Sequence, residues 1–440
     1  MPIRRWFGRK RPLVREAVEA HMSGPCEACE TMTHTIRPIE RINLHRALDR
    51  KLGEGGRLIG YSASTHNNVT VSELLLDDKL IAPVQRQRFE TKPDEFLDCV
   101  TRGIYLVYHG GKPIVVLLSL PDSNYDSPAL EVMARDRATT GAMMEWLFQE
   151  LKRELVYKGR TIFLEVDRAG QIHVRFQPVR PTTRESLIFS EELLSVVERN
   201  VLGMVRHGET LRRAGRSTRQ GLLFHGAPGT GKTLMLRYLG SVLPDHTVIV
   251  LTGREQALVR ESCQVARQLA PSLVLFEDVD LIARDREDND CPTLLHDLMN
   301  EMDGLGPKAE VIFVLTTNRP ETLEAALTAR PGRIDQAIEF PLPDDDCRRR
   351  LFVLYGKGLS LSGVDLPRWI DRTNGVSPAF IEELLRKSTL MAAVRGEASD
   401  PLELRDEDVH RAMEELVVFG GELTQKLLGF HTFGFGKGKG

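Results

Sequence analysis

From about residue 220 onward, short apolar runs alternate along the chain with longer segments whose apolar residues recur at helical spacing. The clearest apolar runs are GLLFHG at 221–226, LVLFEDVD at 273–280 and VIFVLTTNRP at 311–320. Runs of this length suit buried strands, and strands that alternate with helices predict a parallel sheet covered by helices. The pattern therefore predicts an α/β fold for this part of the chain.

The pattern on either side is different. Residues 36–180 mix strands and helices, which predicts an N-terminal α+β domain. Its elements include a hairpin that turns at Gly110 and Gly111, and the strand pair TIFLEV and IHVRF. A helix is also expected, with one apolar face formed by Leu130, Met133, Met144, Leu147 and Leu151. Residues 343–418 contain only segments with helical periodicity, which predicts a smaller α-helical domain.

Boundaries follow from breaks in these patterns. Pro178 and Pro181 interrupt the apolar pattern and predict a linker, after which the α/β core spans residues 186–342. Ser190 is expected to cap the first helix of this core. The basic residues 1–35, with a short helix around 14–22, are expected to be a flexible segment. The Gly-rich residues 419–440 are expected to be a flexible tail.

Composition narrows the picture only slightly. The 440 residues carry a formal net charge of -3, so no global field favours nucleic acid or a membrane surface. Six cysteines are spread along the chain, which is typical of a reducing compartment, and we expect a cytoplasmic protein without a transmembrane segment. Cys26 and Cys29 are close in sequence, but no second cysteine pair completes a zinc pattern, so free thiols are favoured over a metal site.

A phosphate-binding motif lies between the first apolar strand and the following helix. It comprises Gly226, Ala227, Pro228, Gly229, Thr230, Gly231, Lys232 and Thr233. Glycines let successive backbone N–H groups turn toward phosphates, the lysine reaches the β and γ oxygens, and the threonine hydroxyl can ligate magnesium. The motif predicts that the chain binds ATP with Mg²⁺.

Acids at the end of LVLFEDVD suit the same site. A P-loop protein needs a second strand that brings one carboxylate beside the metal and another beside the attacking water. Glu277 and Asp278 are the candidates, with Glu277 on the metal side and Asp278 on the water side. A third polar residue, Asn318, follows the next apolar strand and can hydrogen-bond the γ-phosphate or the water.

These motifs together resemble the AAA subgroup of the AAA+ ATPases over roughly residues 186–418. LMNEMDGLG at 298–306 resembles the segment after the acidic strand, Asn318 is similar to the sensor-1 residue, and ALTARPGRID at 326–335 resembles the second region of homology. The resemblance implies that Arg330 and Arg333 act as arginine fingers toward a neighbouring subunit. It also implies a hexameric ring that hydrolyses ATP, remodels a protein partner and carries a helical lid after residue 343.

The chain departs from the family pattern at the two acids and at the pore loop. The usual order of the acids is Asp then Glu, whereas Glu277 precedes Asp278 here, an order similar to that of the mitochondrial translocase of the Rieske iron–sulfur protein. Each side chain then differs in length by one methylene, which predicts slower turnover. No aromatic residue lies between 247 and 275, where a threading ATPase carries its pore loop. Leu258 or Val259 could substitute for it, although packing in the helix that follows is the favoured role.

Other family features are also missing from the sequence. No arginine occupies the sensor-2 position near 375–379, and no His-Glu-x-x-His motif of a fused zinc protease occurs. Two other functions stay open at this stage. One is a scaffold that ATP assembles with little turnover, which the two departures above favour. The other is a nucleic-acid motor, which would need a basic channel, whereas the pore-loop region mixes arginines with glutamates.

Overall fold

The computed structural model divides the chain into two compact units, Met1–Pro178 and Val179–Gly440. We refer to them as the N-terminal and C-terminal units and describe each by itself. The structure describes residues 13–62, 69–76, 79–120, 129–153, 155–166, 172–176, 181–252, 258–280, 298–302, 304, 309–321, 334–396 and 399–419.

An antiparallel sheet forms the centre of the N-terminal unit, with strand order β1-β7-β6-β5-β2-β3 and with β4 paired to β5. The strands are β1 (Glu30–Thr35), β2 (Arg57–Tyr61), β3 (Ile81–Ala82), β4 (Gln85–Lys92), β5 (Glu95–His109), β6 (Lys112–Ser119) and β7 (Ala129–Ala134). The predicted hairpin at Gly110 and Gly111 is confirmed, because β5 and β6 pair from Arg102 with Ser119 to His109 with Lys112.

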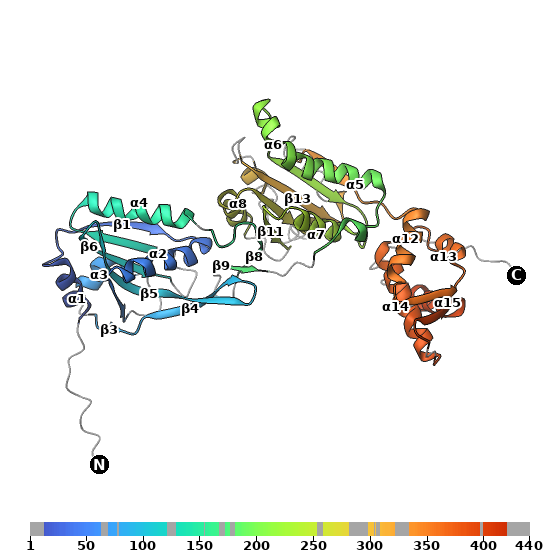
Figure 1. The fold of residues 1–440 in the computed structure, drawn as a ribbon, viewed down its shortest axis with the longest axis horizontal. Helices are drawn as coiled ribbons and strands as arrows, with labels where there is room; N and C mark the ends of the chain where they lie inside the picture. The colour runs from blue at the N-terminus through green and yellow to red at the C-terminus, as the bar shows by residue number, and fades with distance from the viewer. Residues whose placement is uncertain are drawn as a thin grey trace, which may run out of the picture. The chain divides into compact units, whose positions relative to one another are not determined.

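Helices cover both faces of this sheet. Alternate residues of β6 point to opposite faces, as the pleat requires: Ile114, Val116 and Leu118 pack in one core and Val115 and Leu117 in the other. The first core includes α2 (Arg41–Gly53) and α4 (Arg137–Arg153), and the second includes α1 (Val14–Met22) and α3 (Val71–Leu76). Figure 1 shows α4 running over the strands of this unit. The predicted strand pair is also present, as β8 (Thr161–Val166) and β9 (Ile172–Phe176).

Two expectations for this unit are wrong. The flexible segment predicted through residue 35 is folded from residue 13 on, because Val14, Val18 and Met22 are buried against the sheet and β1 belongs to the sheet. Residues 1–12 lie outside the described part. Leu130 and Met133, expected on a helix, lie in β7, whereas Met144, Leu147 and Leu151 are indeed on α4. The short strand and the helix are both apolar, so helical spacing continues by chance across their junction.

A parallel sheet forms the centre of the C-terminal unit, which confirms the predicted α/β fold. Its strands follow the order β14-β10-β13-β12-β11. They are β10 (Gln220–His225), β11 (Thr247–Leu251), β12 (Ser272–Phe276), β13 (Val311–Thr317) and β14 (Gln336–Glu339). The helices of this part include α5 (Glu191–Glu198), a π-helical turn (Arg199–Gly203), α6 (Met204–Arg213), α7 (Lys232–Val242) and α8 (Val259–Gln268). Ser190 caps α5 as predicted, since its side chain accepts a hydrogen bond from the Leu193 backbone N–H.

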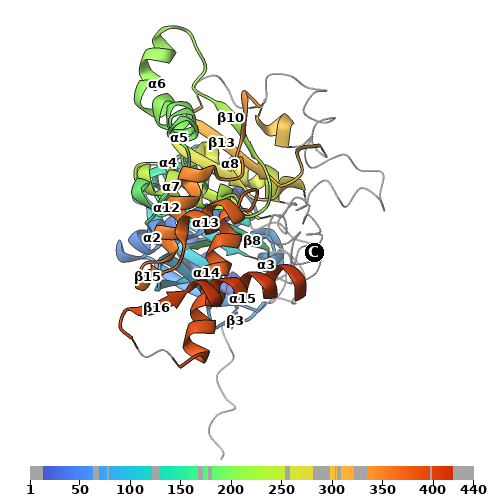
Figure 2. The same cartoon turned by 90° about the vertical axis from the view of Figure 1, so that its right-hand side faces the viewer.

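The helices predicted after residue 343 are present, and Figure 2 shows them grouped together. They are α12 (Asp345–Tyr355), α13 (Leu366–Arg372), α14 (Pro378–Val394) and α15 (Asp406–Glu414), with a parallel strand pair, β15 (Leu359–Gly363) and β16 (Leu402–Arg405). Trp369 and Phe380 are fully buried among them. We call this group the helical lid. Within the described residues, no helix is both long and apolar enough to cross a membrane.

Candidate functional site

The loop between β10 and α7 has the geometry of a phosphate-binding loop. β10 ends at His225, and α7 begins at Lys232. Gly226 and Gly229 have φ values of +145° and +74°, which L side chains rarely adopt. A Cβ on Gly226 would lie 2.3 Å from the carbonyl oxygen of Phe340, and one on Gly229 would lie 2.8 Å from the Cβ of Ala379. The loop is therefore wedged between the sheet and the helical lid at positions that only glycine fits.

Lys232 is held inside this loop. Its side chain is 6% exposed, and its Nζ donates to the carbonyl oxygens of Gly226 (2.8 Å) and Ala227 (2.9 Å). Burial lowers its pKa to about 8, although the negative charges of Asp278 and Asp280 counteract the shift. The Nζ also donates to Thr230 Oγ1 at 3.4 Å, so all its hydrogen-bond acceptors are neutral oxygens, and a phosphate oxygen at this position would stabilise the cation.

The two predicted acids follow β12 directly, at the carboxyl edge of the sheet. Asp278 has a φ of +53°, and its backbone N–H donates to Thr316 Oγ1 at 3.0 Å. Its Oδ1 accepts a hydrogen bond from Asn318 Nδ2 at 3.1 Å, so the structure brings these two predicted residues together. Burial raises the pKa of Glu277 and of Asp278, and Arg237 and Lys232 oppose the respective shifts.

Asp280 is a third member of this group that the sequence interpretation did not assign. Its side chain is 4% exposed, and its Oδ1 accepts from Thr317 Oγ1 (3.0 Å) and from the backbone N–H of Asn318 (3.2 Å). Asp280 therefore fixes the backbone that carries Asn318. The signal was in the sequence, because a third acid two residues beyond Asp278 is costly in a buried position unless it has partners.

A cavity of about 730 Å³ opens beside these groups. The phosphate-binding loop forms one wall, Asp278 and Asn318 form another, and Tyr355, Ala379 and Glu382 of the helical lid face them. Ile188, Phe189 and Leu351 add apolar surface. A lining that combines apolar side chains with a buried lysine and polar groups suits a ligand that joins a flat ring to phosphates.

The other predicted residues either lie outside the described part of the chain or lie elsewhere in the fold. Arg330 and Arg333 lie outside the described residues, and so does most of the pore loop expected near 252–256, because residues 253–257 are not described. Leu258 and Val259 are both buried at the start of α8, as expected for packing residues. Cys26 and Cys29 are free thiols, and within the described residues no group of three or more histidine, cysteine or acidic side chains could hold a metal.

Comparison with known proteins identifies this part of the chain. The profile of the family described as "ATPase family associated with various cellular activities (AAA)" matches residues 222–342, which include every catalytic and phosphate-binding candidate. These residues form an AAA domain. The match begins inside β10 and ends just before the helical lid.

Relatives of the AAA domain share it at moderate identity. The chain is 32% identical over 201 residues to the probable 26S proteasome regulatory subunit 6B of Caenorhabditis elegans, covering 42% of this chain and 48% of that protein. It is 30% identical over 237 residues to the proteasome-activating nucleotidase of Thermococcus onnurineus (51% and 58%). It is 31% identical over 235 residues to the ATP-dependent zinc metalloprotease FtsH 2 of Sphaerobacter thermophilus (50% and 36%). The chain thus spans about half the length of the curated relatives it matches, or less.

Proposed function

We propose that this chain hydrolyses ATP and uses the cycle to remodel a protein partner. One observation carries the proposal: Lys232, Asp278 and Asn318, which come from three separate elements, converge on one cavity large enough for a nucleotide. The fold alone would not suffice, because one fold hosts many functions. The AAA domain and its relatives, whose names include a proteasome-activating nucleotidase and an ATP-dependent metalloprotease, support the same activity.

The residues present fit ATP with Mg²⁺. Lys232 is buried on carbonyl oxygens that a phosphate would replace, and it begins α7, at whose N-terminus the backbone N–H groups favour an anion. Thr233 lies in the first turn of the same helix and would ligate Mg²⁺, with Glu277 supporting the metal from the end of β12. Bound Mg²⁺ supplies positive charge at the β and γ phosphate oxygens.

Hydrolysis needs a base for the attacking water, and Asp278 is the acid that lines the cavity beside Asn318. Burial raises its pKa, which makes its carboxylate a better proton acceptor. The amide of Asn318 is bonded to this carboxylate at 3.1 Å and can therefore orient both the water and the γ-phosphate. Thr316 and Asp280 fix the backbones of the two residues.

We further propose that the chain works as a homo-oligomeric ring of the hexameric type that the AAA resemblance implies. Arg330 and Arg333 would reach the nucleotide of the neighbouring subunit and neutralise charge on the transferred phosphoryl group. The wide spacing of the cysteines supports a cytoplasmic location.

A scaffold that ATP assembles with little turnover is the second candidate. The observation that favours it is the short side chain of Asp278, which is held by Asn318 and is one methylene shorter than the glutamate usual at this position. A displacement of about 1 Å from the reacting atoms can lower a rate about a hundredfold.

The deciding experiment is steady-state ATP hydrolysis measured with Mg²⁺ over a range of protein concentration, with assembly followed by sedimentation. Wild type is compared with Lys232→Ala, Asp278→Asn and Arg333→Ala, and Arg213→Ala, an exposed arginine at the end of α6, serves as the matched control. We expect the turnover of the wild type to rise with assembly. Each of the three substitutions should abolish turnover, and the control should retain it.

Two results would contradict the proposal. If ATP binds and builds rings while wild-type turnover equals that of Asp278→Asn, the scaffold is correct. If Arg333→Ala hydrolyses ATP as fast as wild type at every concentration, the arginine does not act on a neighbour.

A further inference from the structure

The strand β1 forms a border of the N-terminal sheet. It pairs with β7 over six consecutive residues, from Glu30 with Ala134 to Thr35 with Ala129, and among the described residues no strand pairs with its other side. Proteins usually protect such a border with proline, lysine or a bulge. The sequence ETMTHT has neither residue type, and the register with β7 is continuous.

Side chains on this border divide into two rows. Glu30, Met32 and His34 pair with residues of β7 that face α4, whereas Thr31, Thr33 and Thr35 point to the opposite face. Met32 is 39% exposed, and Phe148 on the neighbouring helix α4 is 38% exposed. The border therefore offers a backbone edge with apolar side chains along one side and threonines along the other.

Helix α4 is fixed beside β1 at two points. Thr140 Oγ1 donates to the carbonyl oxygen of Glu30 at 3.3 Å, and the rings of His34 and Phe148 meet edge to face with centroids 4.9 Å apart. Glu30 to His34 spans about 13 Å in a strand, and Thr140 to Phe148 spans about 12 Å in a helix. The helix and the strand therefore run alongside each other over the length of the border.

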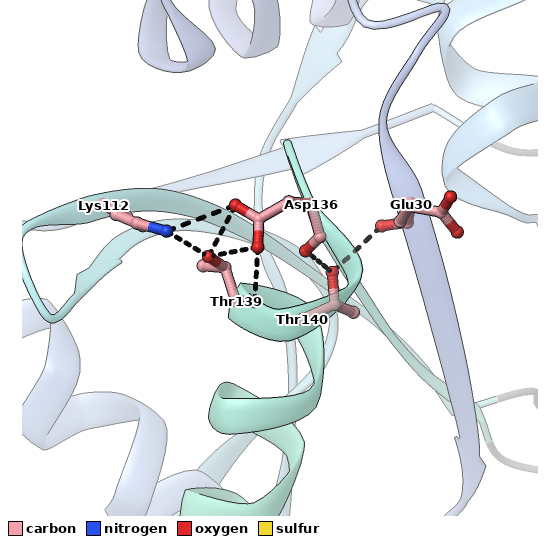
Figure 3. A network of polar contacts seen from close by, with 5 residues as sticks. All are labelled: Glu30, Lys112, Asp136, Thr139 and Thr140. Carbon is pink, nitrogen blue, oxygen red and sulfur yellow. Dashed lines mark hydrogen bonds and ion pairs between the residues drawn. The ribbon is translucent and has the colours of Figure 1, made fainter.

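The first turn of α4 is itself anchored by polar contacts, shown in Figure 3. Asp136 accepts hydrogen bonds from the backbone N–H and the hydroxyl of Thr139 at 2.8 and 2.9 Å, and Lys112 of β6 donates to Thr139 Oγ1 at 2.9 Å. We call the outer side of β1 (30–35) together with the adjoining side of α4 (140–148) the lane. Its two elements are held in place before anything binds, which lowers the entropic cost of binding.

We propose that this lane binds an extended segment of a partner polypeptide, which adds a strand to β1. A sheet border presents N–H and C=O groups at the spacing of another strand, so the ligand it recognises is a polypeptide backbone. Side chains of the segment at alternate positions would contact Met32 and Phe148, and we expect those positions to be apolar. The inference rests on the proposed action on a protein partner, and it places the recruitment of that partner on the N-terminal unit.

The size of the lane favours a segment over a second copy of this chain. A stable dimer buries about 800 Å² on each partner. The lane offers one strand of six residues and two partly exposed apolar side chains, which suits a short peptide. Its strand also carries little charge, since Glu30 is the single acid of β1 and the strand has no lysine or arginine.

The test uses fluorescein-labelled casein, an unfolded polypeptide, and follows its fluorescence anisotropy with the full chain and without nucleotide. The variant Met32→Lys/Thr33→Lys places a lysine on each face of the border, where it opposes strand addition. Phe96→Lys is the matched control, because Phe96 is an exposed aromatic residue of the same unit on β5. We expect the double variant to bind casein about tenfold more weakly than wild type and the control to bind unchanged.

Hydrogen exchange of the wild-type chain with and without casein gives an independent readout. We expect casein to protect the amides of residues 30–35. Absence of casein binding by wild type, equal binding by both variants, or protection confined to other residues overturns the inference. If the double variant instead abolishes self-association of the chain seen by sedimentation, the border binds a second copy and the inference is also wrong.

This outcome is separable from that of the proposed function. If the two lysines weaken casein binding but the wild-type chain does not hydrolyse ATP, the proposed peptide binding at the lane is supported and the proposed ATPase activity is contradicted. If ATP hydrolysis is normal and the double variant binds casein as wild type does, the ATPase activity is supported and peptide binding at the lane is contradicted.

Discussion

Replacement of Asp280 tests whether the site depends on a residue that never touches the nucleotide. Its Oδ1 accepts both from the hydroxyl of Thr317 and from the backbone N–H of Asn318. Hydrogen bonds to a charged acceptor contribute at least about 1.5 kcal/mol each, so Asp280→Ala should lower the free energy of unfolding by about 3 kcal/mol. Asp280→Asn keeps a carbonyl oxygen for both donors and loses only the charge, so it should cost about 1 kcal/mol.

The effect on catalysis has a distinct signature. Without Asp280, the backbone of Asn318 loses its anchor, and the amide that holds Asp278 moves with it. We expect kcat of Asp280→Ala to fall at least about tenfold. KM should change little, because Asp280 is not among the residues that line the cavity.

The assay combines urea unfolding of the C-terminal unit within the full chain with steady-state ATP hydrolysis. Asp245→Ala, an exposed acid in the turn before β11, is the matched control. The reasoning is refuted if Asp280→Ala unfolds at the same urea concentration as the control and hydrolyses ATP at the wild-type rate. A loss of stability with unchanged kcat would leave Asp280 a structural residue without a positioning role.

Three further predictions concern backbone conformation and pH. Gly229→Ala and Gly215→Ala introduce a Cβ at nearly the same φ, +74° and +70°, but only the Cβ at Gly229 meets Ala379, at 2.8 Å. We expect both variants to lose about 1 kcal/mol of unfolding free energy in urea. Only Gly229→Ala should weaken nucleotide binding in a calorimetric titration. Asp278→Glu should lower the free energy of unfolding by about 1 kcal/mol, because aspartate and asparagine tolerate a φ of +53° better than glutamate, whereas Asp278→Asn should not; equal unfolding curves for the two would contradict this reasoning. Burial lowers the pKa of His45, which is 3% exposed; the charge of Asp49 opposes this shift, and Arg86 and Arg46 add to it. Below about pH 6.5 the unfolded chain therefore binds the proton more readily than the folded chain, and the stability decreases as the pH is lowered. Tm should therefore fall less between pH 7 and pH 5 in His45→Gln than in wild type, whereas His207→Gln, at an exposed position, should behave like wild type.

Local patterns were enough to predict the AAA core. The apolar strands, the phosphate-binding loop, the capping serine before α5 and the helices of the lid all depend on residues close together in the chain. Propensity, capping and the need for glycine act over a few residues, so they are visible without tertiary contacts. The convergence of Asp278 and Asn318 was also predictable, because the carboxyl ends of neighbouring parallel strands share one edge.

Contacts between distant residues decided the rest. Val14, Val18 and Met22 look like part of a basic tail, but a sheet built from residues 30–134 covers them. The sequence marks Asp280 as a third acid that needs partners if it is buried, but only the fold supplies them, because it places Thr317 and Asn318 beside it. Likewise, Gly229 had to be glycine because Ala379 of the lid, 150 positions along the chain, occupies the space of its side chain. The sequence by itself determined which elements form and which chemistry they carry, whereas burial and partnership depend on which elements pack together, and only the tertiary structure decides that.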